Sequence, residues 1–478
     1  MVARARGACG RKVELHVYYQ NSIMGRGYLH SVLWIVLASM LALIAMYWLP
    51  DVAAGDWTMR KIDMLSDLRP VSAATDSVEM LEVKNKIDSC RPGMTCIDDM
   101  SGLEHQGMEP LWLALDSLGS QGRPVRIAVL GDSYIEGDIL TSDLREALQR
   151  RFGGSGVGYM PMCSEVAGFR RSVQQQFGGW TAHNGNDPSG YSPQWANFTG
   201  HYFMAGSGAW VSAAGVRNFL SRLDTCAQSS FYCMGTGVAS VTAEVNGVPQ
   251  PSQTLNPAGS VATATVRGRI GRVRWTVNSS SGSMAYLGVS MDPDRGIVVD
   301  NYSLRSASGF QLYSVTPKML SDFDAARHYD LVVVMYGLNV ATPKGANYTH
   351  YHNKMKEIIE RMKAAMPRTG FLVVGCSDRA ERSGGSLKTM RGVLNLINTQ
   401  QRLAYDCHVA FWNLYAAMGG EGSIVAMVNA RPRMANLDYT HINWNGGHHL
   451  ASIMADAIVW GYQCHQVETG QIKKTEMK

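Results

Sequence analysis

The chain carries little net charge once its first 27 residues are set aside. The whole sequence of 478 residues has a formal net charge of +5. Five basic side chains and one acidic side chain within 1–27 account for +4 of this charge, which leaves about +1 for the rest. A protein that binds nucleic acid through its phosphates needs a surplus of basic side chains. The near-neutral body therefore argues against nucleic acid as a partner.

The sequence also lacks any spacing of cysteine and histidine that is typical of a zinc site. His448 and His449 are adjacent, and neighbours on a helix point about 100° apart, so the two imidazoles would not readily bind one ion. We expect no metal and no cofactor. The composition, with 46% hydrophobic and 17% charged residues, has no collagen-like or disordered bias. The length indicates two or three domains.

Charge is absent from residues 31–49. At a rise of ~1.5 Å per residue, these 19 residues span roughly 28 Å, about the thickness of a bilayer core. Basic residues precede the run and acidic residues follow it. The positive-inside rule then predicts a cytoplasmic tail over 1–27, a single transmembrane helix over 28–50 in the inner membrane, and a periplasmic body. The alternative is a signal peptide cleaved near "VAA" at 52–54.

Eight of the nine cysteines fall in this expected periplasmic body. Cys90 with Cys96 and Cys226 with Cys233 are close in sequence and are plausible disulfides in an oxidising compartment. Buried free thiols are the alternative, which we favour for Cys376 because it ends an apolar run.

Short apolar runs alternate with helical patterns in two separate parts of the chain. This alternation predicts an α/β domain whose parallel sheet is covered by helices on both faces. The expected strands cover 125–130, 329–337, 370–376 and 408–415, and the expected helices cover 142–152, 351–366, 389–405 and 447–462.

The α/β pattern is interrupted over 177–297. This stretch is rich in Gly, Ser, Thr and Val, shows short alternating runs and has no helix-length periodicity, which predicts an inserted β-sandwich. The α/β domain is then split into a first part over 109–176 and a second part over 298–464. Residues 51–108 are expected to be a stalk or linker, and 465–478 a polar C-terminal tail.

Gly131-Asp132-Ser133 directly follows the first predicted strand. Active residues of open parallel sheets gather where strands end at their carboxyl edge. A serine there exposes its hydroxyl, and its own N–H can stabilise an oxyanion, so Ser133 is a candidate nucleophile. The alternative is an ordinary strand-to-helix turn with a capping residue.

Two further stretches supply complementary groups. Asn339 follows the strand over 329–337, where its amide could donate to an oxyanion or merely cap a turn. Asp438 precedes His441 by three residues, so its carboxylate could orient the imidazole as a general base. The alternative for Asp438 and His441 is an exposed ion pair.

Together these stretches resemble the blocks of the SGNH (GDSL-type) hydrolases. The first block is matched by Gly131-Asp132-Ser133, the third by Gly337-Leu338-Asn339 and the fifth by Asp438-Tyr439-Thr440-His441. The second block, normally a glycine, is best matched by Ser306. The resemblance implies a flavodoxin-like three-layer sandwich, a catalytic triad and an oxyanion hole. The implied triad is Ser133, Asp438 and His441, and the implied oxyanion hole consists of Ser133, Ser306 and Asn339.

Within that group, the β-rich insertion resembles the envelope-associated peptidoglycan O-acetylesterases and related O-acetyltransferases. This narrower resemblance implies a serine esterase that removes O-acetyl groups from a cell-envelope glycan, with an acetylated polysaccharide as substrate. Two alternatives remain open. One is an O-acetyltransferase with the same triad, and the other is a non-catalytic glycan-binding protein with a vestigial triad.

Overall fold

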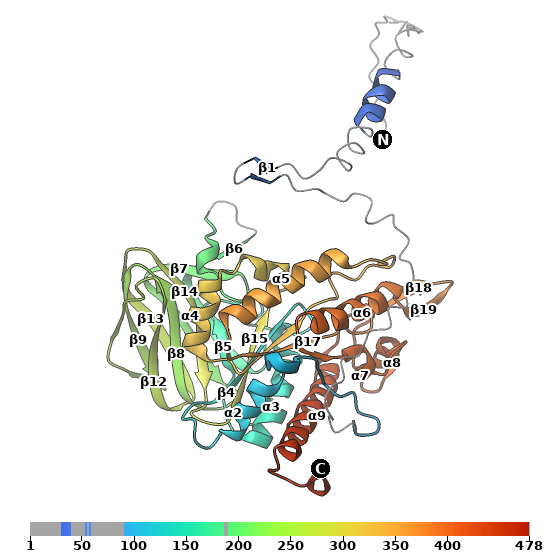
Figure 1. The fold of residues 1–478 in the computed structure, drawn as a ribbon. Helices are drawn as coiled ribbons and strands as arrows, with labels where there is room; N and C mark the ends of the chain where they lie inside the picture. Colours follow the sequence, from blue (N-terminus) through green and yellow to red (C-terminus); the bar gives the residue numbers. More distant parts are fainter. Residues whose placement is uncertain (1–29, 40–52, 55–56, 59–89, 186–189, 478) are drawn as a thin grey trace, which may run out of the picture. The chain divides into compact units, whose positions relative to one another are not determined.

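The computed structural model describes residues 30–39, 53–54, 57–58, 90–185 and 190–477 (Figure 1). The chain divides into two units, Met1–Glu79 and Met80–Lys478. In the first unit, residues 30–39 are helical, and β1 (Ala53–Ala54) pairs antiparallel with β2 (Trp57–Thr58).

The expectation of a transmembrane helix over 28–50 is corrected by the structure. Among the described residues, no helix is both long enough and apolar enough to cross a membrane. At ~1.5 Å per residue, the helical residues 30–39 extend only about 15 Å, half of a bilayer core. Residues 40–52, and the cytoplasmic tail expected over 1–27, lie outside the described residues.

A six-stranded sheet forms the centre of the α/β domain in the second unit. Its spatial order is β15-β4-β16-β17-β20-β3, and neighbouring strands are parallel except β20 and β3. All seven residues of β4 are buried, as expected for a strand covered on both faces. The strands are β3 (Asp98–Asp99), β4 (Val125–Gly131), β15 (Ile297–Ser303), β16 (Leu331–Met335), β17 (Gly370–Val374) and β20 (Ala410–Trp412).

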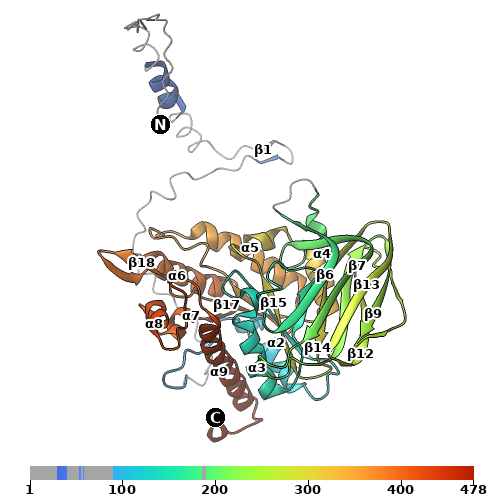
Figure 2. The same cartoon turned by 180° about the vertical axis from the view of Figure 1, so that it is seen from behind.

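Helices cover both faces of this sheet. Figure 1 shows α4, α5 and α6 above the sheet and α2, α3 and α9 below it, and Figure 2 shows the same layers from behind. The three-layer α/β arrangement implied by the resemblance is therefore present. The α-helices are α2 (Glu109–Asp116), α3 (Thr141–Phe152), α4 (Pro317–Arg327), α5 (Thr349–Ala365), α6 (Arg391–Asp406), α7 (Leu414–Met418), α8 (Ser423–Asn429) and α9 (Trp444–Glu468). Short 3-10 helices are η2 (Gly102–Glu104), η3 (Glu136–Asp138), η4 (Pro193–Trp195), η5 (Phe310–Ser314) and η6 (Lys474–Glu476), and β18 (Ala380–Ser383) pairs with β19 (Ser386–Thr389).

The strand order places a crevice beside the first strand of the sheet. From β4 the chain continues to β15 on one side and then to β16 on the other side, so β4 lies at the topological switch point. Ligand sites of open parallel sheets form outside the carboxyl ends of the strands at such a point. The residues that follow β4, β15 and β16 therefore meet at one edge.

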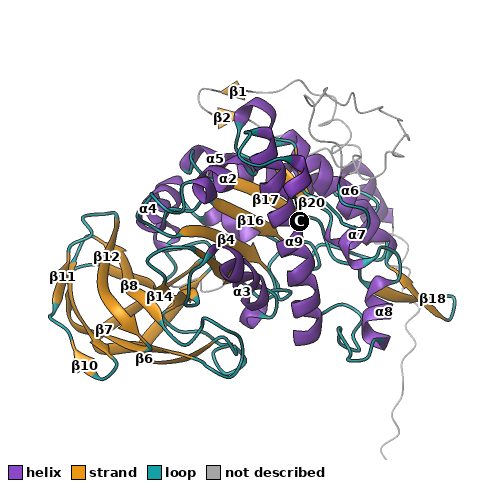
Figure 3. Ribbon diagram, turned by 90° about the horizontal axis from the view of Figure 1, so that it is seen from below, coloured by secondary structure: helices purple, strands orange, loops and turns teal. Residues whose placement is uncertain are grey.

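A β-rich module interrupts the α/β domain. Its strands form one branched antiparallel sheet, which curves around its own core at the lower left of Figure 3. Trp275 and Phe231 are fully buried in that core, which is separate from the core of the α/β domain. The strands are β5 (Gly158–Pro161), β6 (Val173–Asn184), β7 (His201–Gly215), β8 (Cys226–Gly235), β9 (Val238–Val245), β10 (Val248–Pro249), β11 (Gln253–Leu255), β12 (Val261–Ile270), β13 (Arg272–Ser281) and β14 (Met284–Asp292).

The β-rich module begins earlier than the boundary expected at 177. Its first strand, β5, pairs with β14, which is the last strand of the module in the sequence. The second strand, β6, begins at Val173, before the expected boundary. The sequence hides these strands because β5 has only four residues and three consecutive glutamines follow the first residue of β6.

The region expected to be a stalk over 51–108 also differs from the prediction. β3 pairs with β20 and adds an antiparallel edge to the central sheet. A two-residue strand is too short to show any periodicity in the sequence.

Of the two plausible disulfides, the structure contains one. Cys90 and Cys96 are bonded, with their Cα atoms 5.8 Å apart. Cys226 and Cys233 are free and buried. Both lie on β8, seven residues apart, which corresponds to about 23 Å along a strand, far beyond the reach of a disulfide. Cys376 is a buried free thiol, as expected.

Candidate active site

Ser133 lies in a tight turn directly after β4. The turn is closed by hydrogen bonds from the Ile135 N–H to the Asp132 carbonyl and from the Glu136 N–H to the Ser133 carbonyl, both 3.3 Å long. After the 3-10 helix η3, α3 begins at Thr141, which agrees with the helix expected over 142–152. Ser133 is half-buried.

Ser133, His441 and Asp438 form a continuous hydrogen-bonded chain, although 308 residues separate the serine from the histidine. Ser133 Oγ lies 3.0 Å from His441 Nε2. His441 Nδ1 lies 2.8 Å from Asp438 Oδ2. These are the distances expected of a nucleophile, a base and the group that orients the base.

The ionisation of Asp438 determines which ring nitrogen of His441 carries the proton. Partial burial raises the pKa of Asp438, but hydrogen bonds from the His441 N–H and ring and from the Thr440 N–H outweigh it and lower the pKa overall. Asp438 is then an acceptor-only carboxylate near neutral pH. His441 Nδ1–H donates to it, which leaves Nε2 free to accept the proton of Ser133 Oγ–H.

The loop that carries the histidine is fixed by backbone hydrogen bonds on both sides. Ala435 and Ile442 form an antiparallel bridge, and the Asn436 N–H donates to the His441 carbonyl at 2.8 Å. α9 follows at once, and the side chain of Asn443 caps it by accepting from two backbone N–H groups. Such a cap satisfies N–H groups that the helix itself leaves unpaired.

Asn339 reaches across the crevice toward the turn of the serine. Its Nδ2 donates to Asp132 Oδ2 at 3.2 Å and to the Ala307 carbonyl at 2.9 Å. Asp132 is buried, and its Oδ1 accepts from the Tyr134 N–H at 2.9 Å. Burial raises the pKa of Asp132 to about 6, although hydrogen bonds from Tyr134, Gly337 and Asn339 and the charge of His441 oppose the rise.

Ser306 lies at the same edge, in a backbone conformation that favours glycine. Its φ angle is 61°, within the left-handed region. The Leu304 N–H donates to the Gly131 carbonyl at 2.9 Å, which holds this turn against the end of β4. In the described part of the chain, neither the Ser133 N–H nor the Ser306 N–H donates to another group.

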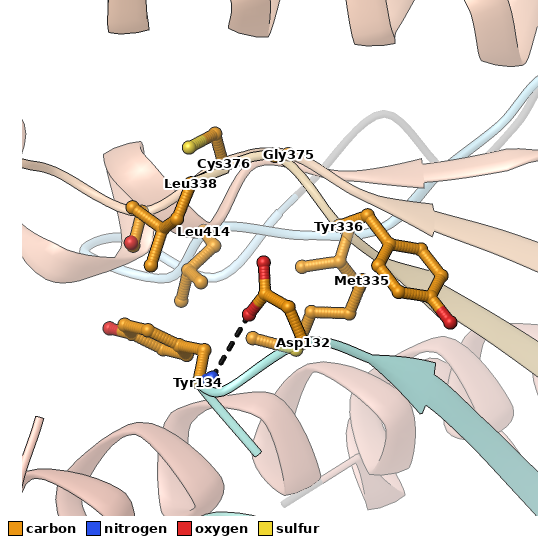
Figure 4. Close-up of a pocket in the computed structure, with 11 residues that line it drawn as sticks. Asp132, Tyr134, Met335, Tyr336, Leu338, Gly375, Cys376 and Leu414 are labelled. Carbon is orange, nitrogen blue, oxygen red and sulfur yellow. Dashed lines mark hydrogen bonds between the residues drawn. The ribbon is translucent and has the colours of Figure 1, made fainter. Parts of the chain in front are cut away.

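A small cavity lies beside Asp132, the residue before Ser133 (Figure 4). It is lined by Asp132, Tyr134, Leu338 and Cys376, among others, and holds about 10 Å³, which is room for about one water molecule. A molecule much larger than water does not fit there, so a larger ligand would reach Ser133 from the open surface. The exposed fractions of the His441 and Asp438 side chains, 38% and 48%, agree with an open site.

The structure therefore brings five expected site residues to one edge of the sheet: Ser133, Ser306, Asn339, Asp438 and His441. Sequence reasoning missed Asp132 as the acceptor for Asn339, since 207 residues separate them. The sequence offered one signal for a role of Asp132, which is that it directly precedes the candidate nucleophile Ser133.

Comparison with known proteins supports the fold. No family model matches the chain, and no curated protein matches it. The chain is similar to a solved peptidoglycan O-acetylesterase, with a TM-score of 0.62 and 20% identity over 77% of this chain and 99% of that one. At this identity the likeness shows a shared fold, which is the SGNH-type fold that the motifs resemble.

Two other solved structures are much less similar. A family two carbohydrate esterase from Cellvibrio japonicus has a TM-score of 0.26 and 8% identity over 61% of this chain and 99% of that one. An acetyl xylan esterase has a TM-score of 0.26 and 15% identity over 34% of this chain and 81% of that one. TM-scores this low do not establish a shared fold.

Proposed function

We propose that this chain is a serine esterase that removes O-acetyl groups from a cell-envelope glycan of the peptidoglycan type. The observation that carries the proposal is the hydrogen-bonded chain of Ser133, His441 and Asp438, with distances of 3.0 and 2.8 Å. The SGNH-type fold and the peptidoglycan substrate named for the similar structure support the substrate class.

In the proposed mechanism, His441 Nε2 removes the hydroxyl proton as Ser133 Oγ attacks the acetyl carbonyl carbon. The Ser133 and Ser306 N–H groups stabilise the oxyanion, and Asn339 contributes its amide as a third donor. Because that amide already donates to Asp132 and Ala307, its bond to the oxyanion is a shared one. One such donor is typically worth about 10²–10³ in rate.

The intermediate then collapses, and the bond between the acetyl carbon and the sugar oxygen breaks. The protonated His441 gives its proton to the leaving sugar oxygen, and the acetyl group stays on Ser133. Water, deprotonated by His441, attacks the acyl-enzyme and releases acetate. Transfer to a sugar hydroxyl is the second candidate, but the exposure of the triad gives water free access and favours hydrolysis.

The test is hydrolysis of p-nitrophenyl acetate and release of acetate from O-acetylated peptidoglycan by the full-length protein. Ser133→Ala and His441→Ala should each lower kcat by about 10⁴-fold or more, and Asp438→Ala should lower it less. Ser133 should be labelled by a fluorophosphonate in the wild type. Wild-type activity retained in Ser133→Ala would contradict the proposal, and transfer of acetyl to added glycan in preference to water would support the transferase.

We also propose that the second unit works outside the cytoplasm, in the periplasm. The support is the disulfide between Cys90 and Cys96, since disulfides persist in oxidising compartments and are rare in the cytosol. Trapping thiols in intact cells with an alkylating reagent should leave these two cysteines unmodified. Their complete alkylation without prior reduction would contradict this location.

A further inference from the structure

Loops of the β-rich module contact Trp444, which directly follows the loop that carries His441 (the histidine loop, residues 434–443). Trp444 begins α9, three residues after His441. The Phe169 and Phe219 rings lie 5.5 and 5.4 Å from its ring, centroid to centroid, and the Arg171 guanidinium lies 4.7 Å above the ring. Phe169 and Arg171 lie between β5 and β6, and Phe219 lies between β7 and β8, so all three belong to loops of the β-rich module. We call these three residues the Trp444 clamp.

The same stretch of the module also holds the segment that follows the nucleophile. A Cβ atom on Gly137 would lie 2.4 Å from the Phe169 ring, so the phenyl group packs directly on that backbone. The fully buried carboxylate of Asp138 accepts from Arg170 Nε at 3.0 Å and from Ser172 Oγ at 2.5 Å. One short stretch therefore touches both the serine segment and the first residue of α9.

The histidine loop has few apolar contacts of its own. Asp438 and His441 are partly exposed, and the Leu437 side chain between the ends of the loop is 64% exposed. The loop has two buried apolar residues, Ala435 and Ile442, and both lie near its ends. Backbone hydrogen bonds fix the shape of the loop, so its orientation toward Ser133 depends on where α9 begins, and the Trp444 clamp helps to hold that point.

We propose that Trp444 is a positioning residue: held by the clamp, it directs His441 toward Ser133. The β-rich module thereby supports the reaction itself, on small as well as polymeric substrates. This inference rests on the proposed esterase function. Its energetic basis is ordinary, since aromatic pairs and cation–π contacts each contribute beyond simple burial, and active sites lose activity when their supporting groups loosen.

The experiment compares Trp444→Ala, Trp444→Phe and the double variant Phe169→Ala/Phe219→Ala with the wild type. Phe177→Ala, in a half-exposed phenylalanine of β6, is the matched control. We expect kcat on p-nitrophenyl acetate to fall at least tenfold in Trp444→Ala and in the double variant, with KM changed less than twofold. Trp444→Phe should restore most of kcat, and Phe177→Ala should match the wild type.

Amide hydrogen exchange over 434–443 provides a readout that does not need activity. Exchange there should speed up at least tenfold in Trp444→Ala and in the double variant, while β4 keeps its protection. A fold defect alone would lower protection in β4 as well. Wild-type kcat and wild-type exchange in Trp444→Ala would overturn the inference. An inactive wild type would instead overturn the proposed function, and exchange over 434–443 would still test the clamp.

Discussion

At the scale of single residues, Ser306 shows how a backbone angle constrains the choice of side chain. A left-handed φ of 61° costs a non-glycine residue about 1–2 kcal/mol, whereas glycine adopts it freely. Because glycine also loses more entropy on folding, we expect Ser306→Gly to raise the free energy of unfolding by about 0.5–1 kcal/mol. The N–H stays in place, so kcat should be unchanged.

Urea unfolding and p-nitrophenyl acetate kinetics check this expectation. Ser308→Gly is the matched control, since Ser308 lies two residues on without a left-handed backbone and should lose stability. If Ser306→Gly also lost stability, the backbone at 306 would not be strained.

Asp132 should make stability depend on pH. Burial raises the pKa of its carboxyl to about 6 in the folded protein, from an ordinary value of 3.8. The folded state then binds the proton more tightly than the unfolded state. Its contribution to stability is therefore complete below about pH 4 and is lost as the pH rises through 6. The asparagine side chain in Asp132→Asn cannot ionise, so this variant does not lose stability at this site as the pH rises.

We expect the stability of Asp132→Asn relative to the wild type to increase by roughly 1–1.5 kcal/mol from about pH 5 to about pH 7.5. kcat should fall at least tenfold, because the new amide has one accepting oxygen and its NH2 group cannot accept, so the bond from Tyr134 or the bond from Asn339 is lost. Urea unfolding at the two pH values measures the first effect. A relative stability that does not change with pH would mean that Asp132 titrates normally.

Which site residues the sequence could predict depended on how local their signals are. Ser133, Asn339, Asp438 and His441 each stand in a short motif at the end of a predicted element. The bond between Asp132 and Asn339 has no such signal, because it arises only when β4 and β16 are neighbours in the sheet.

At the scale of elements, the sequence predicted strands that are mostly apolar and missed a strand that carries two adjacent buried polar residues. β16 and β17 read as continuous apolar runs, and β4 contains one polar residue, Arg126. β15 carries Asp300 and Asn301, and its residues were not among the expected strands. The structure satisfies both side chains: Asp300 pairs with Arg327 at 2.5 Å, and Asn301 donates to the Ile135 carbonyl at 2.8 Å. The pattern of apolar residues along a strand does not show hydrogen-bond and ion-pair partners that come from distant segments of the chain.

The start of α9 approaches the serine segment so closely that it requires glycine. A Cβ atom on Gly447 would lie 1.6 Å from the Ile139 carbonyl oxygen, so the helix cannot keep its position with a larger residue. We expect Gly447→Ala to destabilise the protein by about 2–3 kcal/mol and to lower kcat at least tenfold. Ala is the better helix former by about 1 kcal/mol, so propensity alone predicts the opposite sign.

Thermal unfolding and esterase kinetics test this prediction. Ser452→Ala, at an exposed position of α9, is the control and should change neither property. A stabilised, fully active Gly447→Ala would show that α9 is not packed against this carbonyl.

At the scale of the whole second unit, the β-rich module and the α/β domain share a buried charge network. Arg327 of α4 pairs with Asp292 at the end of β14 and with Asp300 of β15, at N–O distances of 2.5 Å. Tyr329 also donates to Asp300 at 2.7 Å. A buried ion without its partner is strongly destabilising. Separating the β-rich module from the α/β domain would therefore cost free energy. The β-rich module interrupts the α/β domain in the sequence, but in the structure the two parts are joined by buried ion pairs.

This network predicts that the two parts unfold together. Arg327→Ala would leave the buried Asp300 without a cationic partner and Asp292 with only the more distant Arg126, 3.6 Å away. We therefore expect it to destabilise the protein by about 3–5 kcal/mol, whereas Arg267→Ala, at an exposed position of β12, should have little effect. In the wild type, far-ultraviolet circular dichroism and tryptophan fluorescence should report one coincident urea transition for the second unit.

Two tryptophans report on the two parts separately. Trp275 reports on the β-rich module and Trp412 on the central sheet, since each is buried in its own core. Single Trp275→Phe and Trp412→Phe variants, each silencing one reporter, should give the same midpoint after correction for their own stability. Two separate transitions would show that the module is an independent domain and that Arg327 does not couple it to the catalytic sheet.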